Sequence, residues 1–73
     1  YPNPFTDKTT VDFGRVVESG DVIVIDVLGQ IVDVYKIDRQ SELTIERESK
    51  PKGIYFVELN INNKRLFKKI TVE

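Results

Sequence analysis

Alternation of apolar and polar residues is the dominant pattern along this chain, and it predicts β-strands from end to end. Between Tyr55 and Ile61 every second residue is apolar, and Val11 and Phe13 alternate with polar neighbours in the same way. Because successive side chains of a strand point to opposite faces, this pattern places one face of each strand against a core. The predicted strands are residues 9–13, 21–27, 30–37, 42–46, 54–61 and 65–72, with a short seventh strand at 15–17 as an alternative.

The same alternation selects the residues of the core. Two segments do not follow it: residues 22–25 are apolar on both faces, which suits a central strand partly covered by a loop, and Leu66-Phe67 breaks the alternation as a β-bulge would. The pattern leaves the phase of both segments open. The residues expected to be buried are Val11, Phe13, Val22, Val24, Val32, Tyr55, Val57, Leu59 and Ile61.

Four short segments carry residues that favour tight turns. In residues 26–29 the Asp26 side chain can bond the backbone two residues further on, and Gly29 can adopt a positive φ. Asn62-Asn63 tolerates the left-handed region twice, as a type I′ hairpin requires. The other two turn signals are Lys50-Pro51-Lys52-Gly53 and Ser19-Gly20-Asp21. Several short strands at this spacing favour a two-sheet sandwich or a small barrel.

Composition and length strengthen the all-β prediction. Val, Ile and Thr are abundant while Ala is absent, and β-branched side chains favour a pleated sheet over a helix. The 73 residues make one domain, residues 1–73, with a small core. We expect a monomer, and the length excludes an enzyme with a cleft between two lobes.

The missing residue types remove most catalytic and metal-binding chemistry. Without His or Cys the chain lacks the commonest general base, the thiol nucleophile and the usual zinc, haem and iron–sulfur ligands. Asp26, Asp33 and Asp38 do not form the Asp-x-Asp-x-Asp-Gly pattern of a calcium loop, so we interpret them as solvated carboxylates. The sequence therefore predicts no catalytic residue, no cofactor and no metal site.

Charge and hydropathy exclude two further classes of partner. Eleven basic and twelve acidic residues are interspersed, and the formal net charge of -1 does not favour nucleic acid. The longest apolar run, residues 22–25, is too short to insert into a bilayer, and the N-terminus does not resemble an ordinary export signal. The chain begins with Tyr1, which is compatible with a domain taken from a longer protein.

Three local features each have an ordinary structural explanation when taken singly. Residues 2–5, PNPF, place two prolines around an asparagine, which fixes an extended segment before the first strand. Gly53 followed by Tyr55 is common where a strand begins. Lys68 and Lys69 can protect an edge strand from aggregation.

Taken together and in order, the motifs are more specific. PNPF, TTVDF, VIVIDVLGQIV, KGIYFVEL and KKITV follow one another over essentially the whole chain. This series resembles the type A C-terminal sorting domain of the type IX secretion system of the Bacteroidota. Glu73 departs from the pattern, since many relatives end on a basic or amide residue. The residues that match the family motifs are Pro2, Asn3, Pro4, Gly29, Gly53, Tyr55, Lys68, Lys69, Ile70 and Val72.

The resemblance implies a fold, a function and a set of partners. The fold would be an immunoglobulin-like β-sandwich of six to seven mostly antiparallel strands. The domain would direct a periplasmic precursor, with cargo fused on its N-terminal side, to the type IX translocon and its outer-membrane shuttle protein. A cell-surface sortase would then usually remove the domain and leave the cargo anchored at the surface or secreted. The terminal motif would be the segment recognised, and the domain itself would not be an enzyme.

A rival hypothesis is a β-sandwich adhesion or carbohydrate-binding module. Such modules usually display aromatic side chains on a flat face or groove, and Phe5, Tyr35, Phe56 and Phe67 are the candidates for such a patch. An enzyme is a third hypothesis, which the small size and the missing side chains disfavour.

Overall fold

The computed structural model describes residues 4–73, and these form one antiparallel sheet of four strands, with the order β2-β1-β3-β4. The strands are β1 (Lys8–Asp26), β2 (Ile31–Glu46), β3 (Gly53–Ile61) and β4 (Lys64–Val72). The prediction of an all-β chain is confirmed. The number of strands differs from the prediction of six to seven, because two of the four strands each contain more than one predicted strand.

β1 is the clearest of these differences. The turn predicted at Ser19-Gly20-Asp21 is wrong, because all three residues lie inside β1, which pairs there with β2 and β3. A Cβ atom at Gly20 would lie 2.6 Å from the Asn60 carbonyl oxygen. The glycine therefore allows β1 to approach β3 closely and does not reverse the chain.

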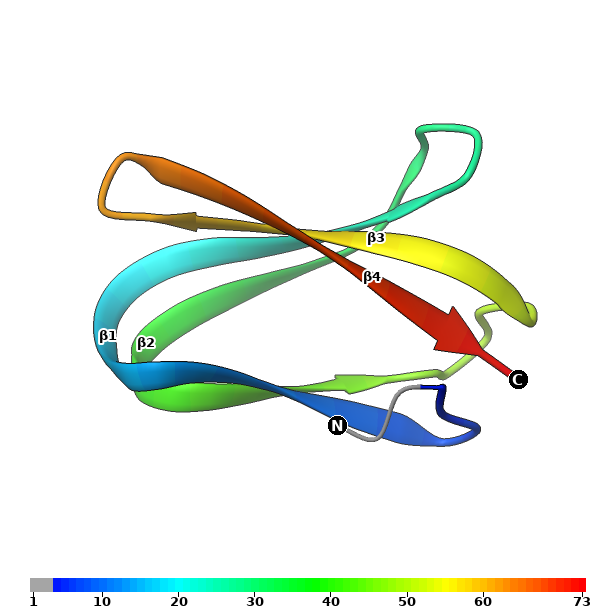
Figure 1. Cartoon of the computed structure of the whole chain (residues 1–73), viewed down its shortest axis with the longest axis horizontal. Coiled ribbons are helices and arrows are strands. Elements are labelled where there is room, and N and C mark those ends of the chain that lie inside the picture. The colour runs from blue at the N-terminus through cyan, green and yellow to red at the C-terminus, as the bar shows by residue number, and fades with distance from the viewer. Residues whose placement is uncertain (1–3) are drawn as a thin grey trace.

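The sheet folds over on itself because β1 and β2 are bent. The register between them shifts from Asp12 to Val17, and Gly14 within this bulge has a φ of 76° and donates to the Asp12 Oδ1 atom at 2.8 Å. Figure 1 shows β1 and β2 curving together at one side, so that residues 8–12 and 42–46 form a second layer facing β3 and β4. The core lies between the two layers.

The interior matches most of the predicted core. Val11, Val22, Val24, Tyr55, Val57, Leu59 and Ile61 are buried as predicted, and Phe13 is half-buried against them. The core also contains the following residues: Phe5, Val17, Ile37, Leu43, Ile45, Ile70 and Val72.

Val32 is the exception among the predicted core residues, since 41% of it is exposed. The β1–β2 register moves from Val24 opposite Asp33 to Ile25 opposite Ile31, which leaves Val32 without a ladder partner. Asp33, opposite the buried Val24, takes the inward-facing place instead. There its carboxylate accepts hydrogen bonds from Tyr35 and Lys50. The prediction assigned this inward-facing position to the apolar neighbour, Val32.

The structure shows which side chains face the core in residues 22–25 and at Leu66-Phe67, the two segments that do not follow the alternation. Val22 and Val24 face the core, and Ile23 is half-buried on the opposite face. The β3–β4 register runs without a shift from Gly53 opposite Val72 to Ile61 opposite Lys64, so the β-bulge predicted at Leu66-Phe67 is wrong. Both of these apolar residues are exposed, on opposite faces of β4.

Two of the predicted turns have the expected geometry. Asn62 and Asn63 connect β3 to β4 with φ values of 52° and 62°, as a type I′ turn requires. Asp26 Oδ1 accepts hydrogen bonds from the backbone of Leu28 and Gln30 at 2.9 Å each, in the turn between β1 and β2. Local side-chain chemistry therefore fixed both reversals.

Candidate recognition surface

The outer edge of β4 is one of the two edges of the sheet. Phe5 forms a parallel bridge with Val72 at its C-terminal end, and the Phe5 N–H donates to the Thr71 carbonyl at 2.9 Å. Because backbone groups alternate in direction along a strand, those of Phe67 and Arg65 face this same edge. Within residues 4–73, no strand pairs with the edge beside these two residues.

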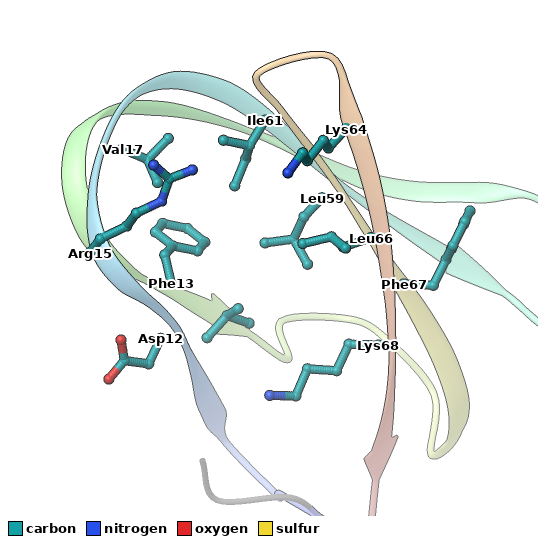
Figure 2. Close-up of a pocket in the computed structure, with 11 residues that line it drawn as sticks. Asp12, Phe13, Arg15, Val17, Leu59, Ile61, Lys64, Leu66, Phe67 and Lys68 are labelled. Carbon is teal, nitrogen blue, oxygen red and sulfur yellow. The ribbon is translucent and has the colours of Figure 1, made fainter.

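A groove with a volume of about 370 Å³ opens beside this edge, between the bend of β1 and the β3–β4 hairpin. In Figure 2, Phe13 reaches into it from β1, while Leu59 and Leu66 extend from β3 and β4 on the opposite side. The residues that line the groove are Val11, Asp12, Phe13, Arg15, Val17, Leu59, Ile61, Lys64, Leu66, Phe67 and Lys68. Most of its surface is apolar.

Basic side chains surround the groove. Arg15, Lys64 and Lys68 all line it and are exposed, and none of the three takes part in an ion pair within residues 4–73. Asp12 is the one acidic residue of the lining. The groove is thus locally positive on a chain whose formal net charge is -1.

The predicted terminal motif is divided between different environments. Lys68 extends toward the groove in Figure 2, whereas Lys69 pairs with Phe56 on the opposite face of the sheet. Ile70 and Val72 are buried, with 1% and 2% of their surface exposed. Their side chains hold β4 onto the core, and Phe5 already pairs with the backbone edge at this end of the strand, so Lys68 and Lys69 are the exposed side chains of the motif.

The other predicted motif residues lie away from the groove. Gly29 is in the turn between β1 and β2, and Gly53 begins β3 with a φ of 152°, a value that other residues rarely adopt. The Tyr55 hydroxyl donates to the Pro51 carbonyl at 2.5 Å and ties the preceding loop to the core. Pro4 is exposed, while Pro2 and Asn3 lie outside the described residues.

A polar network that sequence reasoning missed lies at the inward-facing position of Asp33. Lys50 is buried, and its Nζ atom donates to Asp33 Oδ2 and to the Glu46 carbonyl at 2.8 Å each. The Tyr35 hydroxyl donates to the same Asp33 oxygen at 2.8 Å. Only the ordinary turn signal of Lys50-Pro51 was visible in the sequence, because the partners are far apart along the chain.

This network changes the acidity of two groups. Burial by itself would raise the pKa of Asp33, but the hydrogen bonds from Lys50 and Tyr35 outweigh it and hold the pKa below the usual 3.8. Burial, together with the neighbouring Asp33 carboxylate, raises the pKa of Tyr35 to about 12. The network therefore favours an ionised Asp33 and a neutral Tyr35 at neutral pH.

Arg47 is a second residue that the sequence did not single out. Its Nη1 atom donates to the Glu73 carbonyl at 2.7 Å and its Nε atom to the Lys50 carbonyl at 3.1 Å. The Arg47 backbone N–H donates to the Asp7 carbonyl at 2.8 Å. One residue thus connects the segment before β1, the loop before β3 and the end of the chain.

The aromatic patch of the rival hypothesis does not form as a whole. Phe5 is buried, and Tyr35 is half-buried with its hydroxyl bonded to Asp33. Phe56 and Phe67 remain exposed on the outer face of the sheet.

Fold and surface together define a small all-β domain with an accessible strand edge near its C-terminal end. Over residues 1–73 the chain matches the protein family described as the secretion system C-terminal sorting domain, and it belongs to this family. It is therefore a C-terminal sorting domain of type IX secretion, as the order of its motifs predicted. A search of curated proteins finds no match to the chain.

Membership carries general consequences for the role of the domain. A type IX sorting signal implies cargo fused on the N-terminal side, recognition by the secretion system, and export to the cell surface or beyond. Residues 4–73 contain no helix that is long and apolar enough to cross a bilayer.

Proposed function

We propose that this domain directs a periplasmic precursor to the type IX translocon and its outer-membrane shuttle protein, and that a cell-surface sortase then usually removes it. The observation that supports this proposal most directly is the family match over the whole chain. In this role the domain is a substrate of the export machinery and performs no catalysis. The cargo remains anchored at the surface or is released.

The two-layered arrangement fits the architecture that this role implies. In support of a small immunoglobulin-like β-sandwich, counting the bends of β1 and β2 as breaks between strands would divide the four-stranded sheet into six shorter strands. The N-terminal and C-terminal segments then meet at Phe5 and Val72. A partner that binds β4 would contact the domain close to its junction with the cargo.

Recognition in this proposal takes place at β4. Its outer edge can accept an extended segment by backbone pairing, a common way for proteins to bind peptides. Lys68 and Lys69 are exposed on the two faces of the strand and can add contacts on either side. Ile70 and Val72 keep the strand in place from inside the core.

The proposal is tested with a periplasmic reporter fused to the N-terminus of the domain and expressed in a cell with a working type IX system. The parental domain should deliver the reporter to the surface, and the double variant Lys68→Ala with Lys69→Ala should leave most of it in the periplasm. Both lysines are exposed, so the pair of substitutions should change the unfolding free energy by only about 0.5 kcal/mol.

The matched control is Lys8→Ala with Lys52→Ala, which removes the same charge from exposed positions outside β4 and the groove. This control should be delivered like the parent. If the Lys68 and Lys69 variant melts like the parent and is delivered equally well, the two lysines only protect the edge and do not belong to the signal. If the parental fusion is not delivered at all, the proposed function is wrong.

A further inference from the structure

We propose that the groove beside β4 binds an extended peptide segment of a partner protein that carries both apolar and acidic side chains, which pairs as an additional strand along the outer edge of β4. The inference rests on the proposed function, because that function assigns recognition to β4. It adds to it a specific surface and the chemistry of the segment that the surface accepts.

The shape and lining of the groove favour a strand with apolar side chains. Phe13 and Leu59 form part of an apolar floor, and Leu66 on β4 is 57% exposed beside them. A strand paired with β4 would direct every second side chain to this face of the sheet. Burying Leu66 and the neighbouring floor would remove apolar surface from water, which stabilises the complex.

The charges around the groove specify the remaining side chains. Arg15, Lys64 and Lys68 have no ion-pair partner within residues 4–73, so carboxylates of a bound segment could pair with them without displacing a partner. A single carboxylate, that of Asp12, opposes them. Charge complementarity of this kind selects an acidic segment over a basic one.

The edge itself already pairs with an extended segment at one end. Phe5 runs parallel to β4 there and exchanges backbone hydrogen bonds with Thr71 and Glu73 at 2.9 Å each. The backbone of Arg65 and Phe67 faces the same edge further along, next to the groove. A second extended segment could therefore extend the sheet where Phe5 does not reach.

The binding experiment uses the 73-residue chain labelled with nitrogen-15 and, as the probe, a short, end-capped peptide of repeating Glu-Ser-Val-Ser, which in an extended strand presents alternating glutamate and valine on one face. The expected result is a titration in which the amide signals of residues 64–68 and of the β1 bend near Arg15 shift most. A peptide of repeating Lys-Ser-Val-Ser should bind much more weakly, because the groove cations would repel it. A heparin fragment, which is anionic and has no apolar side chains, serves as the second comparison.

Paired variants locate the site. Lys64→Ser with Lys68→Ser should weaken binding of the acidic peptide about three- to tenfold, because two exposed charges each contribute modestly. Lys8→Ser with Lys52→Ser removes equal charge away from the groove and should leave the affinity unchanged. Arg15→Gln gives a third test on the opposite wall. All of these residues are exposed, and thermal melting verifies that each variant is folded.

Several results would overturn the inference. One is equal affinity for the acidic and basic peptides, and another is an equal loss of peptide affinity in the groove and control variants. The inference also fails if the amide signals that shift are centred away from the groove, or if heparin produces the same shifts with equal affinity. Delivery of the reporter separates this inference from the proposed function. If the parental fusion is delivered but the peptide does not bind the groove, the inference is wrong and the sorting function stands. If the peptide binds the groove but the parental fusion is not delivered, the groove binds peptides as inferred and the proposed sorting function is wrong.

Discussion

Phe5 and Val72 form a parallel bridge that connects the segment before β1 to the last strand of the sheet. The Phe5 N–H donates to the Thr71 carbonyl, the Glu73 N–H donates to the Phe5 carbonyl, and the Arg47 guanidinium donates to the Glu73 carbonyl. Both bridged side chains are buried. The junction toward a fused cargo and the C-terminal strand are therefore parts of one packed unit.

Phe5→Ala should destabilise the domain by about 3 kcal/mol, because it removes a large side chain of which 2% is exposed and leaves a cavity between the layers. Urea unfolding followed by circular dichroism measures this loss. The matched control is Phe67→Ala, which truncates an exposed phenylalanine and should change stability by about 0.5 kcal/mol or less. Equal effects of the two substitutions would show that the Phe5 bridge does not contribute to the core.

Gly20→Ala should cost about 1 to 3 kcal/mol, because the new methyl group would overlap the Asn60 carbonyl oxygen and force β1 and β3 apart. Chemical unfolding again gives the measurement, with the neighbouring and exposed Ser19→Ala as the control. A turn at this position, as the sequence suggested, would tolerate alanine much better. An alanine variant as stable as the parent would contradict the close approach of the two strands.

Acid should weaken the domain through Asp33. The pKa of this carboxyl is lower in the folded chain than its usual 3.8, so its ionised form stabilises the fold above that value. That contribution is lost as the pH falls through the lowered folded pKa. Urea midpoints measured from neutral pH down into this acidic range should therefore decrease.

Asp33→Asn provides the comparison for this acid effect. Asparagine keeps a similar shape but cannot titrate, so the variant should be less stable at neutral pH and lose less stability on acidification. The opposite sign, with Asp33→Asn losing more stability than the parent in acid, would refute the role given to the ion pair with Lys50.

Calorimetry with calcium and with polysaccharide fragments should show no binding above background. Within residues 4–73 no group of three acidic side chains is placed to hold a metal ion, and two of the four aromatic residues of the proposed sugar-binding patch are engaged in the fold. A micromolar dissociation constant for a polysaccharide would restore the carbohydrate-binding hypothesis. One for calcium would reveal a site that the carboxylate arrangement does not indicate.

Local patterns predicted much of this structure, and the failures have identifiable causes. Strict alternation in β3 correctly assigned Tyr55, Val57 and Leu59 to the core, because one face of that strand is wholly apolar. It failed at Val32, where the inward-facing place belongs to Asp33. A partly buried carboxylate in this position needs polar partners, and its partner Lys50 is 17 residues away in the sequence.

The sequence also indicated some parts of the candidate recognition surface and gave no sign of others. The order of short motifs identified the family and drew attention to Lys68 and Lys69, but it could not place them on opposite faces relative to a groove. Arg15 and Lys64 carried no signal of their own in the sequence. Their proximity to Lys68 arises from the bend of β1 and the hairpin between β3 and β4.

Residue types, local turn chemistry and a period of two were enough to predict the all-β class, the hairpin at Asn62-Asn63, half of the core residues and the family. Three features are visible only in the folded chain: β1 continues through Gly20, Asp33 faces inward, and a basic groove opens beside β4. Each of these depends on contacts between segments distant in the chain. From the sequence alone, a glycine in a turn cannot be distinguished from a glycine that allows two strands to approach closely. At Gly20 the distinction comes from the Asn60 carbonyl oxygen on β3.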